Sequence, residues 1–196
     1  MVGEIAMGLI GWILIGVAVL LVVYAIALYN SLVRLRALAQ EGFSGITVQL
    51  RRRADLIPNL VEAVKGYASH ERETLDEVIA RRGEVSAAKG VDATAAADGV
   101  MTGLLSRLFA IAEAYPELKA NTNFLHLQDQ LANIEGELQS SRRYYNATVR
   151  DLNSSIQSFP AVLVAKPMGF AEEPFYRDDD PAIQSAPNVS FARPAA

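Results

Sequence analysis

Residues 5–28 read IAMGLIGWILIGVAVLLVVYAIAL, and no charged side chain occurs between residues 5 and 31. At about 1.5 Å of rise per residue, a helix over these residues is about 36 Å long, enough to cross a hydrocarbon core of about 30 Å with some tilt. The sequence therefore predicts a transmembrane anchor over residues 1–29.

A cleaved signal peptide is the competing interpretation of this segment. Ala25-Ile26-Ala27 resembles a small-x-small cleavage site, and cleavage there would leave a soluble secreted protein. However, no Lys or Arg precedes the apolar run, Glu4 does, and the run is longer than the 7 to 15 residues of a signal-peptide core. These features favour the uncleaved anchor.

The basic residues flanking the apolar segment predict its orientation. No Lys or Arg precedes it, whereas Arg34 and Arg36 follow closely and three more arginines occupy residues 51–53. The positive-inside rule then places the N-terminus outside and the bulk of the chain in the cytoplasm. The lipid bilayer is accordingly the first expected partner.

Composition narrows the possible functions of the remaining chain. There is no cysteine, which excludes disulfides, thiolate metal sites and cysteine nucleophiles. Net charge is −4, and residues 30–159 carry 15 basic against 16 acidic side chains, so no strong positive field attracts nucleic acid. We therefore expect no nucleic-acid partner.

Beyond the anchor, apolar residues recur in steps of three and four, the pattern of an amphipathic helix. The positions are Leu32, Leu35, Ala39, Phe43, Ile46, Leu50, Ala54, Ile57, Val61, Val64, Ala68, Leu75 and Val78. Pro58 lies inside this stripe, lacks an N–H and crowds the preceding turn, so it should bend or break the helix. We predict two helices that meet near Asp55 as the cap of the second, or one kinked rod.

Three further segments complete the expected all-α fold. A loop is predicted around residues 90–95, then a helix that ends or kinks at Tyr115-Pro116, then a last helix over residues 116–159 that Pro160 stops. The third helix should bury Leu104, Leu105, Leu108, Ile111 and Ala112. The stripe of the last helix consists of Phe124, Leu127, Leu131, Ile134, Leu138, Ser141, Tyr145, Val149, Leu152, Ile156 and Phe159.

The predicted organisation is an anchor (1–29), a cytoplasmic antiparallel bundle of about four helices (30–159) and an irregular Pro-rich tail (160–196). Six of the eight prolines lie in the tail, which shows no periodicity. Because the tail contains apolar residues, we expect its first part to pack on the bundle; they are Val162, Leu163, Val164 and later Phe170, Phe175 and Tyr176.

Several blocks of sequence, in order, resemble the LemA family of bacterial membrane proteins. They are YNSLV (29–33), RRRADLIPNLV (51–61), VKGYASHE (64–71), YPELKAN (115–121) and RRYYN (142–146). Ala54 departs from the resemblance, since the family more often has Tyr there. The resemblance implies an anchored, elongated cytoplasmic bundle in the inner membrane of a bacterium. The family has no established reaction; its members resemble scaffolds, and some are linked with membrane stress, membrane-bound metalloproteases or internal-membrane organelles.

The sequence contains no complete catalytic or metal-binding motif. His70-Glu71 begins a zinc-protease pattern, but Thr74 stands where the second histidine is required. Tyr67 and Asn123 occupy the positions three residues before His70 and His126, where a ferritin-like site needs Glu. Phosphate-binding, dinucleotide-binding and nucleophile-elbow motifs are also missing. We expect no metal, no cofactor and no enzyme activity.

Two polar motifs, within residues 51–59 and 142–146, and the pair His70-Glu71 are candidates for partner contact or for setting the register between helices. The candidate residues are Arg51, Arg52, Arg53, Asp55, Pro58, Asn59, His70, Glu71, Arg142, Arg143, Tyr145 and Asn146. The arginine run either contacts anionic headgroups or pairs within the bundle with Asp55, Glu62 or the last helix. The second motif, residues 142–146, lies among apolar neighbours, which favours a structural role.

The predicted function is that of a non-enzymatic membrane scaffold that binds itself or other membrane proteins. Self-association is expected because Leu32, Leu35 and Ala39 extend the apolar stripe beyond the reach of the shorter third helix. The alternative is an accessory subunit of a membrane proteolysis system, or a hydrolase with an unrecognised site.

Overall fold

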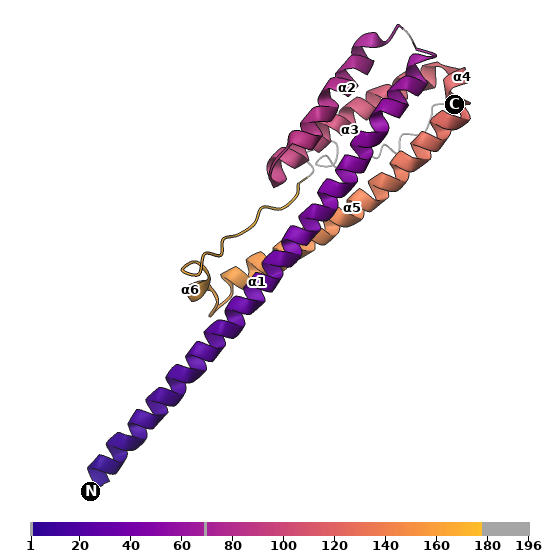
Figure 1. Ribbon diagram of the computed structural model, residues 1–196. Coiled ribbons are helices and arrows are strands. Elements are labelled where there is room, and N and C mark those ends of the chain that lie inside the picture. The colour runs from indigo at the N-terminus through magenta and orange to yellow at the C-terminus, as the bar shows by residue number, and fades with distance from the viewer. Residues whose placement is uncertain (1, 69, 178–196) are drawn as a thin grey trace, which may run out of the picture. The chain divides into compact units, whose positions relative to one another are not determined.

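The computed structural model describes residues 2–68 and 70–177 (Figure 1). This part of the chain forms helices and no strand, which confirms the predicted all-α class. The helices are α1 (Val2–Lys65), α2 (Arg72–Ala87), α3 (Val91–Ala114), α4 (Pro116–Lys119), α5 (Thr122–Gln157) and α6 (Val162–Ala165). Residues 178–196 of the predicted tail lie outside the described residues.

The chain divides into two compact units that share its two longest helices. Unit 1 comprises Met1–Ile46 and Gln139–Phe175, and unit 2 comprises Thr47–Leu138 and Tyr176–Ala196. Unit 1 thus holds the first part of α1, the end of α5 and α6, whereas unit 2 holds the end of α1, α2, α3, α4 and the start of α5.

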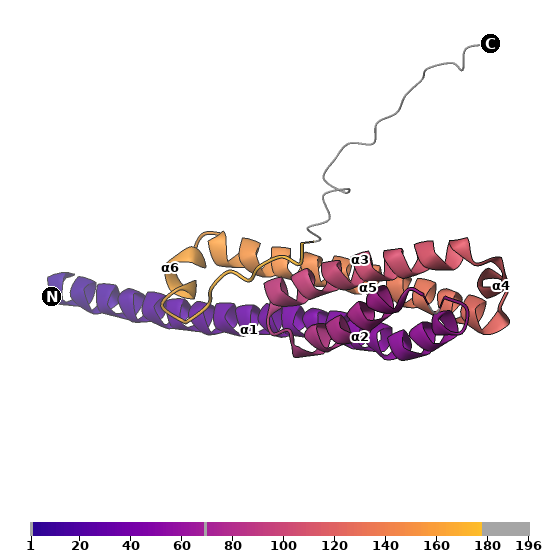
Figure 2. The same cartoon turned by 90° about the horizontal axis from the view of Figure 1, so that it is seen from above.

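Unit 2 is an antiparallel helical bundle. Figure 2, with Figure 1, shows the chain reversing direction between the end of α1, α2, α3 and the start of α5. The reversal after α1 is a tight turn in which the N–H groups of Tyr67 and Ala68 donate to the Val64 carbonyl at 3.0 and 2.9 Å. The bundle core contains Ile57, Leu60, Val61, Val64, Leu75, Val78, Leu104, Leu105, Leu108, Ala112, Phe124 and Leu131.

Of the two alternatives for this stretch, the helix break near Asp55 is wrong and a single helix through Pro58 is correct. Helix α1 runs without interruption from Val2 to Lys65, with Pro58 inside it and Asp55 as an ordinary helical residue. An interior proline costs a helix roughly 3 kcal/mol. Full burial of Ile57 and Leu60 on either side offsets that cost by removing apolar surface from water.

Two other expected boundaries also differ from the structure. Helix α3 begins at Val91, so the loop expected around residues 90–95 is shorter, and Gly90 supplies its positive φ of 82°. The helix expected over residues 116–159 is divided into α4 and α5. Asn121 divides it, because its side-chain oxygen accepts the N–H groups of Asn123 and Phe124 at 2.9 and 3.1 Å and caps α5.

In unit 1, α1 packs against α5 and the first part of the tail. Gly42 lets the helices approach closely, since a Cβ there would lie 3.0 Å from the Tyr145 Cα. The ring of Phe170 in the tail meets Tyr29 edge-on, with centroids 5.6 Å apart. Leu32 and Ala39 are buried, so the apolar surface from which we inferred self-association is covered within the chain itself.

The buried seam of α5 gives a first prediction. Replacing Leu138 with Ala should lower the free energy of unfolding by about 2 to 5 kcal/mol, because the truncation leaves a cavity in a fully buried site. Denaturant unfolding of the detergent-solubilised chain measures the loss. Asn133→Ala, on the exposed side of the same helix, is the matched control and should change it by less than about 0.5 kcal/mol. Equal effects would mean that Leu138 does not face the core.

Candidate interaction site

A buried ion cluster links three helices of unit 2. The guanidinium Nη1 of Arg53, on α1, lies 3.1 Å from the Asp98 carboxylate on α3 and donates to Thr102 Oγ1 at 3.0 Å. Glu135 on α5 contributes a second carboxylate 3.4 Å from the same nitrogen. The side chains of Arg53 and Asp98 are only 10% and 2% exposed. A charge removed from water to this extent needs a partner, and here each supplies the other.

Tyr176 adds a segment distant in sequence to this cluster. Its hydroxyl donates to the second Asp98 oxygen at 2.8 Å, across 78 residues of sequence. The Asp98 carboxylate therefore accepts hydrogen bonds at both oxygens from side chains of unit 2. Such a cluster sets the register between helices and holds Tyr176 on the bundle. With both oxygens engaged and almost no exposure, the carboxylate is not presented to a substrate.

The other residues of the first candidate motif lie outside this cluster. Arg51 and Arg52 are exposed, and Asp55 pairs on the surface with Arg82 at 3.3 Å. Pro58 is half-buried and Asn59 is exposed. The structure thus separates the arginine run into one internal residue, Arg53, and two that face solvent.

His70 and Glu71 lie in the turn before α2. His70 is exposed, while the backbone carbonyl of Glu71 accepts the Leu75 N–H at 3.2 Å in the first turn of the helix. Within the described ranges, no group of three or more His, Cys, Asp or Glu side chains is placed to hold a metal ion. The two residues therefore form part of a turn and a helix start.

The second motif lies in unit 1, where it holds the tail. The Tyr145 hydroxyl donates to the Pro174 carbonyl at 2.7 Å, and its ring lies 5.8 Å from that of Phe43. Arg142 is buried, Arg143 is exposed and donates to Ser140 at 3.0 Å, and Asn146 is half-buried. Asn153 lies about two helical turns after Asn146. Its side-chain amide exchanges two 2.9 Å hydrogen bonds with the Glu173 backbone.

Asp98 is a structural residue that our sequence reasoning missed, and Tyr176 was noted only as one of the apolar residues of the tail. Asp98 lies in an Ala-rich stretch that we interpreted partly as loop. It is nevertheless in phase with Thr94, Met101, Leu105 and Leu108, which follow one face of α3 in steps of three and four. A charged residue in phase with an apolar stripe indicates a buried partner. The spacing of Asp98 in the sequence could therefore have predicted its burial.

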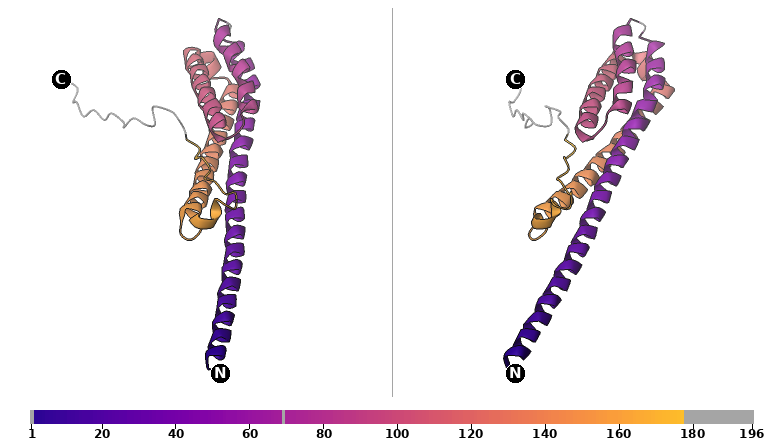
Figure 3. Two further views of the ribbon diagram at one scale, coloured as in Figure 1. Left: turned by 90° about the vertical axis from the view of Figure 1, so that its left-hand side faces the viewer. Right: turned by 60° about the vertical axis from the view of Figure 1, so that its left-hand side comes forward.

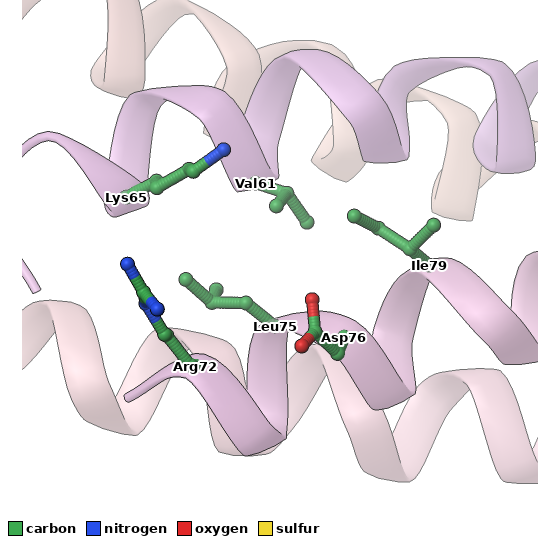
Figure 4. A pocket seen from close by; sticks show the side chains of 6 residues that line it. All are labelled: Val61, Lys65, Arg72, Leu75, Asp76 and Ile79. Atoms are coloured by element: carbon green, nitrogen blue, oxygen red, sulfur yellow. The ribbon is translucent and has the colours of Figure 1, made fainter. Parts of the chain in front are cut away.

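A groove between the end of α1 and α2 is exposed on unit 2 (Figure 4). Its volume is about 250 Å³. Val61 and Leu75 form its apolar floor, and Ile79, 49% exposed, lies at one end. Figure 4 shows Lys65 and Arg72 at the other end and Asp76 beside Leu75; this completes the lining. An apolar floor bordered by charges is the usual composition of a protein contact.

The apolar segment of α1 is largely uncovered from Ile10 onward. Its side chains are exposed up to Tyr29, except those of Ala25 and Leu28, which are half-buried; the exposed ones include Trp12, Leu14, Leu20 and Leu21. This helix is long and apolar enough to cross a membrane, and none of the qualifying window is buried. Helix α3 also passes that test of length and composition, but a third of its window is buried in the bundle core.

The fold and these surfaces define a class: an all-α protein with a helical bundle and a long first helix whose apolar segment is exposed from Ile10 onward. The model of the LemA family matches residues 42–191, well over half of the chain, and the chain belongs to the LemA family. This confirms the family resemblance, and membership fits a membrane-associated protein.

Relatives of known name include magnetosome proteins. The chain is 26% identical over 176 residues to magnetosome protein MamQ of Magnetospirillum gryphiswaldense, covering 76% of this chain and 65% of the relative. It has the same identity to magnetosome protein MamQ 2 of Paramagnetospirillum magneticum, with the same coverage. It is 28% identical over 142 residues to protein LemA of Metamycoplasma hominis, covering 70% of this chain and 63% of that relative. The chain thus spans a little under two thirds of these relatives' lengths.

Proposed function

We propose that this LemA-family chain is a non-enzymatic membrane scaffold that acts through helical protein–protein contacts. The observation that carries the proposal is the buried ion cluster: its Asp98 carboxylate is bonded at both oxygens inside the bundle. This buried charge therefore joins helices and does not face a substrate. The groove between α1 and α2 instead offers an exposed apolar surface with a charged border.

In this proposal the groove receives an amphipathic segment of a membrane protein. An apolar side chain of that segment would lie over Val61 and Leu75, and charges of either sign would find a counterpart among Lys65, Arg72 and Asp76. Candidate partners are a metalloprotease, another membrane protein or a second copy of this chain. Similarity to the MamQ magnetosome proteins supports the membrane-associated part of this proposal.

Ile79 provides the test of this function. A photo-crosslinking amino acid at Ile79 should form adducts in native membranes, whereas the same group at Val100, similarly exposed but on α3 outside the groove, should not. Replacing Ile79 with Asp should weaken binding of the captured partner by about 2 kcal/mol, or roughly thirtyfold, because a charge would enter an apolar contact. Val100→Asp is the matched control.

The outcomes of this experiment separate the candidate partners. Adducts of twice the chain mass, with light scattering that gives more than one chain per detergent particle, would identify self-association. Adducts with a protease, together with altered protease turnover, would identify an accessory subunit. Equal labelling at both sites would remove the groove from the proposal. Turnover of unfolded protein or esters by the purified, metal-loaded chain would overturn the scaffold function.

The orientation is proposed from the arginines that follow the span. Arg34 and Arg36 lie just after it, so the N-terminus should lie outside the inner membrane and the bundle in the cytoplasm. Protease added to intact cells should leave the bundle uncut, and permeabilised cells provide the control in which it is cut. Digestion in intact cells would reverse the orientation, and a released species that begins near Leu28 would indicate a cleaved signal peptide.

A further inference from the structure

Residues 158–165 comprise the connection after α5 and the short helix α6, and together they are called the turn below. This turn exposes large apolar side chains in unit 1. Phe159 is 80% exposed, Leu163 is 65% exposed, and Val162 is also exposed. No charged residue occurs from residue 152 to residue 165. A soluble surface rarely gathers such side chains on one short turn without a function for them.

This turn lies against the membrane-spanning part of α1. Pro160, Leu163 and Val164 line an apolar groove of about 410 Å³, and the opposite wall consists of Leu21, Val22, Tyr24, Ala25 and Leu28. Figure 3 shows the hairpin formed by α5 and α6 beside α1, at some distance from the N-terminus of that helix. The α1 wall belongs to the last third of the apolar segment and extends along about 10 Å of helix.

This contact fixes the depth of the turn relative to the bilayer. Leu21 and Val22 are themselves strongly exposed apolar residues of the span. Any bilayer position that covers them also brings hydrocarbon or headgroups to Leu163, which lines the same groove. The exposed face of the turn is therefore continuous with the lipid-facing surface of α1.

The backbone of the turn is suited to a medium that offers few hydrogen bonds. The N–H groups of residues 162–165 donate to carbonyls of Ser158, Pro160 and Ala161 at 2.8 to 3.1 Å, and Pro160 itself has no N–H. The Ser158 hydroxyl donates to the Ser154 carbonyl at 2.6 Å. These groups consequently avoid the desolvation cost that bars an open loop from lipid.

We propose that Phe159, Val162 and Leu163 insert into the leaflet from which α1 emerges, so that acyl chains fill the apolar groove. Lys166 follows the turn and is exposed, placed as a basic residue at the headgroups. Asp151 lies about 12 Å back along α5 from Phe159, which limits insertion to the interfacial depth of about 5 to 10 Å. The two attachments together would restrict rotation of unit 1 about the α1 axis.

The experiment exploits the lack of cysteine in the natural sequence. Leu163→Cys, Leu20→Cys in the span and Val48→Cys on α1 beyond it each create one thiol for an environment-sensitive fluorophore. The full chain is reconstituted into vesicles of phosphatidylethanolamine and phosphatidylglycerol. We expect the Leu163 probe, like the Leu20 probe, to show blue-shifted emission and to be quenched by lipids with nitroxide-labelled acyl chains. The Val48 probe should instead be quenched by aqueous iodide.

Each contrary result has a distinct meaning. A Leu163 probe that behaves like the Val48 probe, while the Leu20 probe is lipid-quenched, overturns the inserted turn and leaves the α1 anchor standing. A Leu163 probe shielded from both quenchers overturns lipid insertion in favour of a protein contact at the turn. The inference rests on the membrane anchor of the proposed function; loss of lipid quenching at Leu20 would overturn that anchor and the inserted turn with it.

Discussion

Replacing Arg53 with Met is expected to lower the free energy of unfolding by about 3 to 5 kcal/mol, because the substitution removes the Arg53 guanidinium from beside the buried Asp98 carboxylate. Thr102 would lose its donor from Arg53, and the hydroxyl of Tyr176 would remain as the only side-chain donor to Asp98 among the bonds described above. Methionine keeps much of the volume of the arginine stem, so the loss measures charge more than packing.

Denaturant unfolding followed by circular dichroism of the detergent-solubilised chain measures this effect. Arg52→Met is the matched control, since the neighbouring side chain is exposed, and it should change stability by less than about 0.5 kcal/mol. Combining Arg53→Met with Asp98→Asn should restore part of the stability, because the second substitution removes the uncompensated charge. A double variant no more stable than Arg53→Met would show that the loss arises from packing.

Apolar periodicity predicted the helices and most of their buried faces. Steps of three and four identified Leu104, Leu105 and Leu108 on α3, and the structure buries all three. The same rule placed Leu131 and Leu138 in the core seam of α5, where they are buried. The pattern can be recognised in the sequence because burial of an apolar face dominates helix stability, and the residues of that face recur with the helical period.

Local breaking signals were less informative, because tertiary packing can override them. Pro58 was interpreted as a break, yet α1 continues through it while Ile57 and Leu60 are fully buried. Asn121 was not recognised as a stop, although a side-chain cap there begins a new helix. A proline and an asparagine each have two structural outcomes, and the choice depends on contacts that are distant in sequence.

The buried ion cluster was the least predictable part of the candidate site. Three partners were considered for the arginine run: Asp55, Glu62 and the last helix. Glu135 on that helix does pair with Arg53, but the nearer carboxylate, Asp98, lies 45 residues from Arg53 and was not among them. Tyr176 is 78 residues from Asp98, in a tail without periodicity. The partners in such distant pairs cannot be predicted from spacing in the sequence, because they depend on how the helices pack.

Replacing Phe124 with Ala is expected to destabilise unit 2 by about 3 to 5 kcal/mol, because the ring is fully buried. Phe124 lies in the first turn of α5, directly after the Asn121 cap, and meets Phe109 on α3 edge-on at 6.4 Å between centroids. Truncation would therefore remove apolar burial and an aromatic pair at the point where α5 joins the core.

The adjacent residue on the same helix supplies a control for Phe124. Leu125→Ala shortens a side chain that is 43% exposed, so its effect should stay within about 1 kcal/mol. Phe109→Ala should also destabilise the bundle, and combining it with Phe124→Ala should cost less than the sum of the single losses, since both remove the same ring contact. Denaturant unfolding of the three single variants and the double variant measures these losses. Equal losses for Phe124→Ala and Leu125→Ala would place the start of α5 in the wrong rotational phase, whereas strict additivity with Phe109→Ala would show that the rings do not interact.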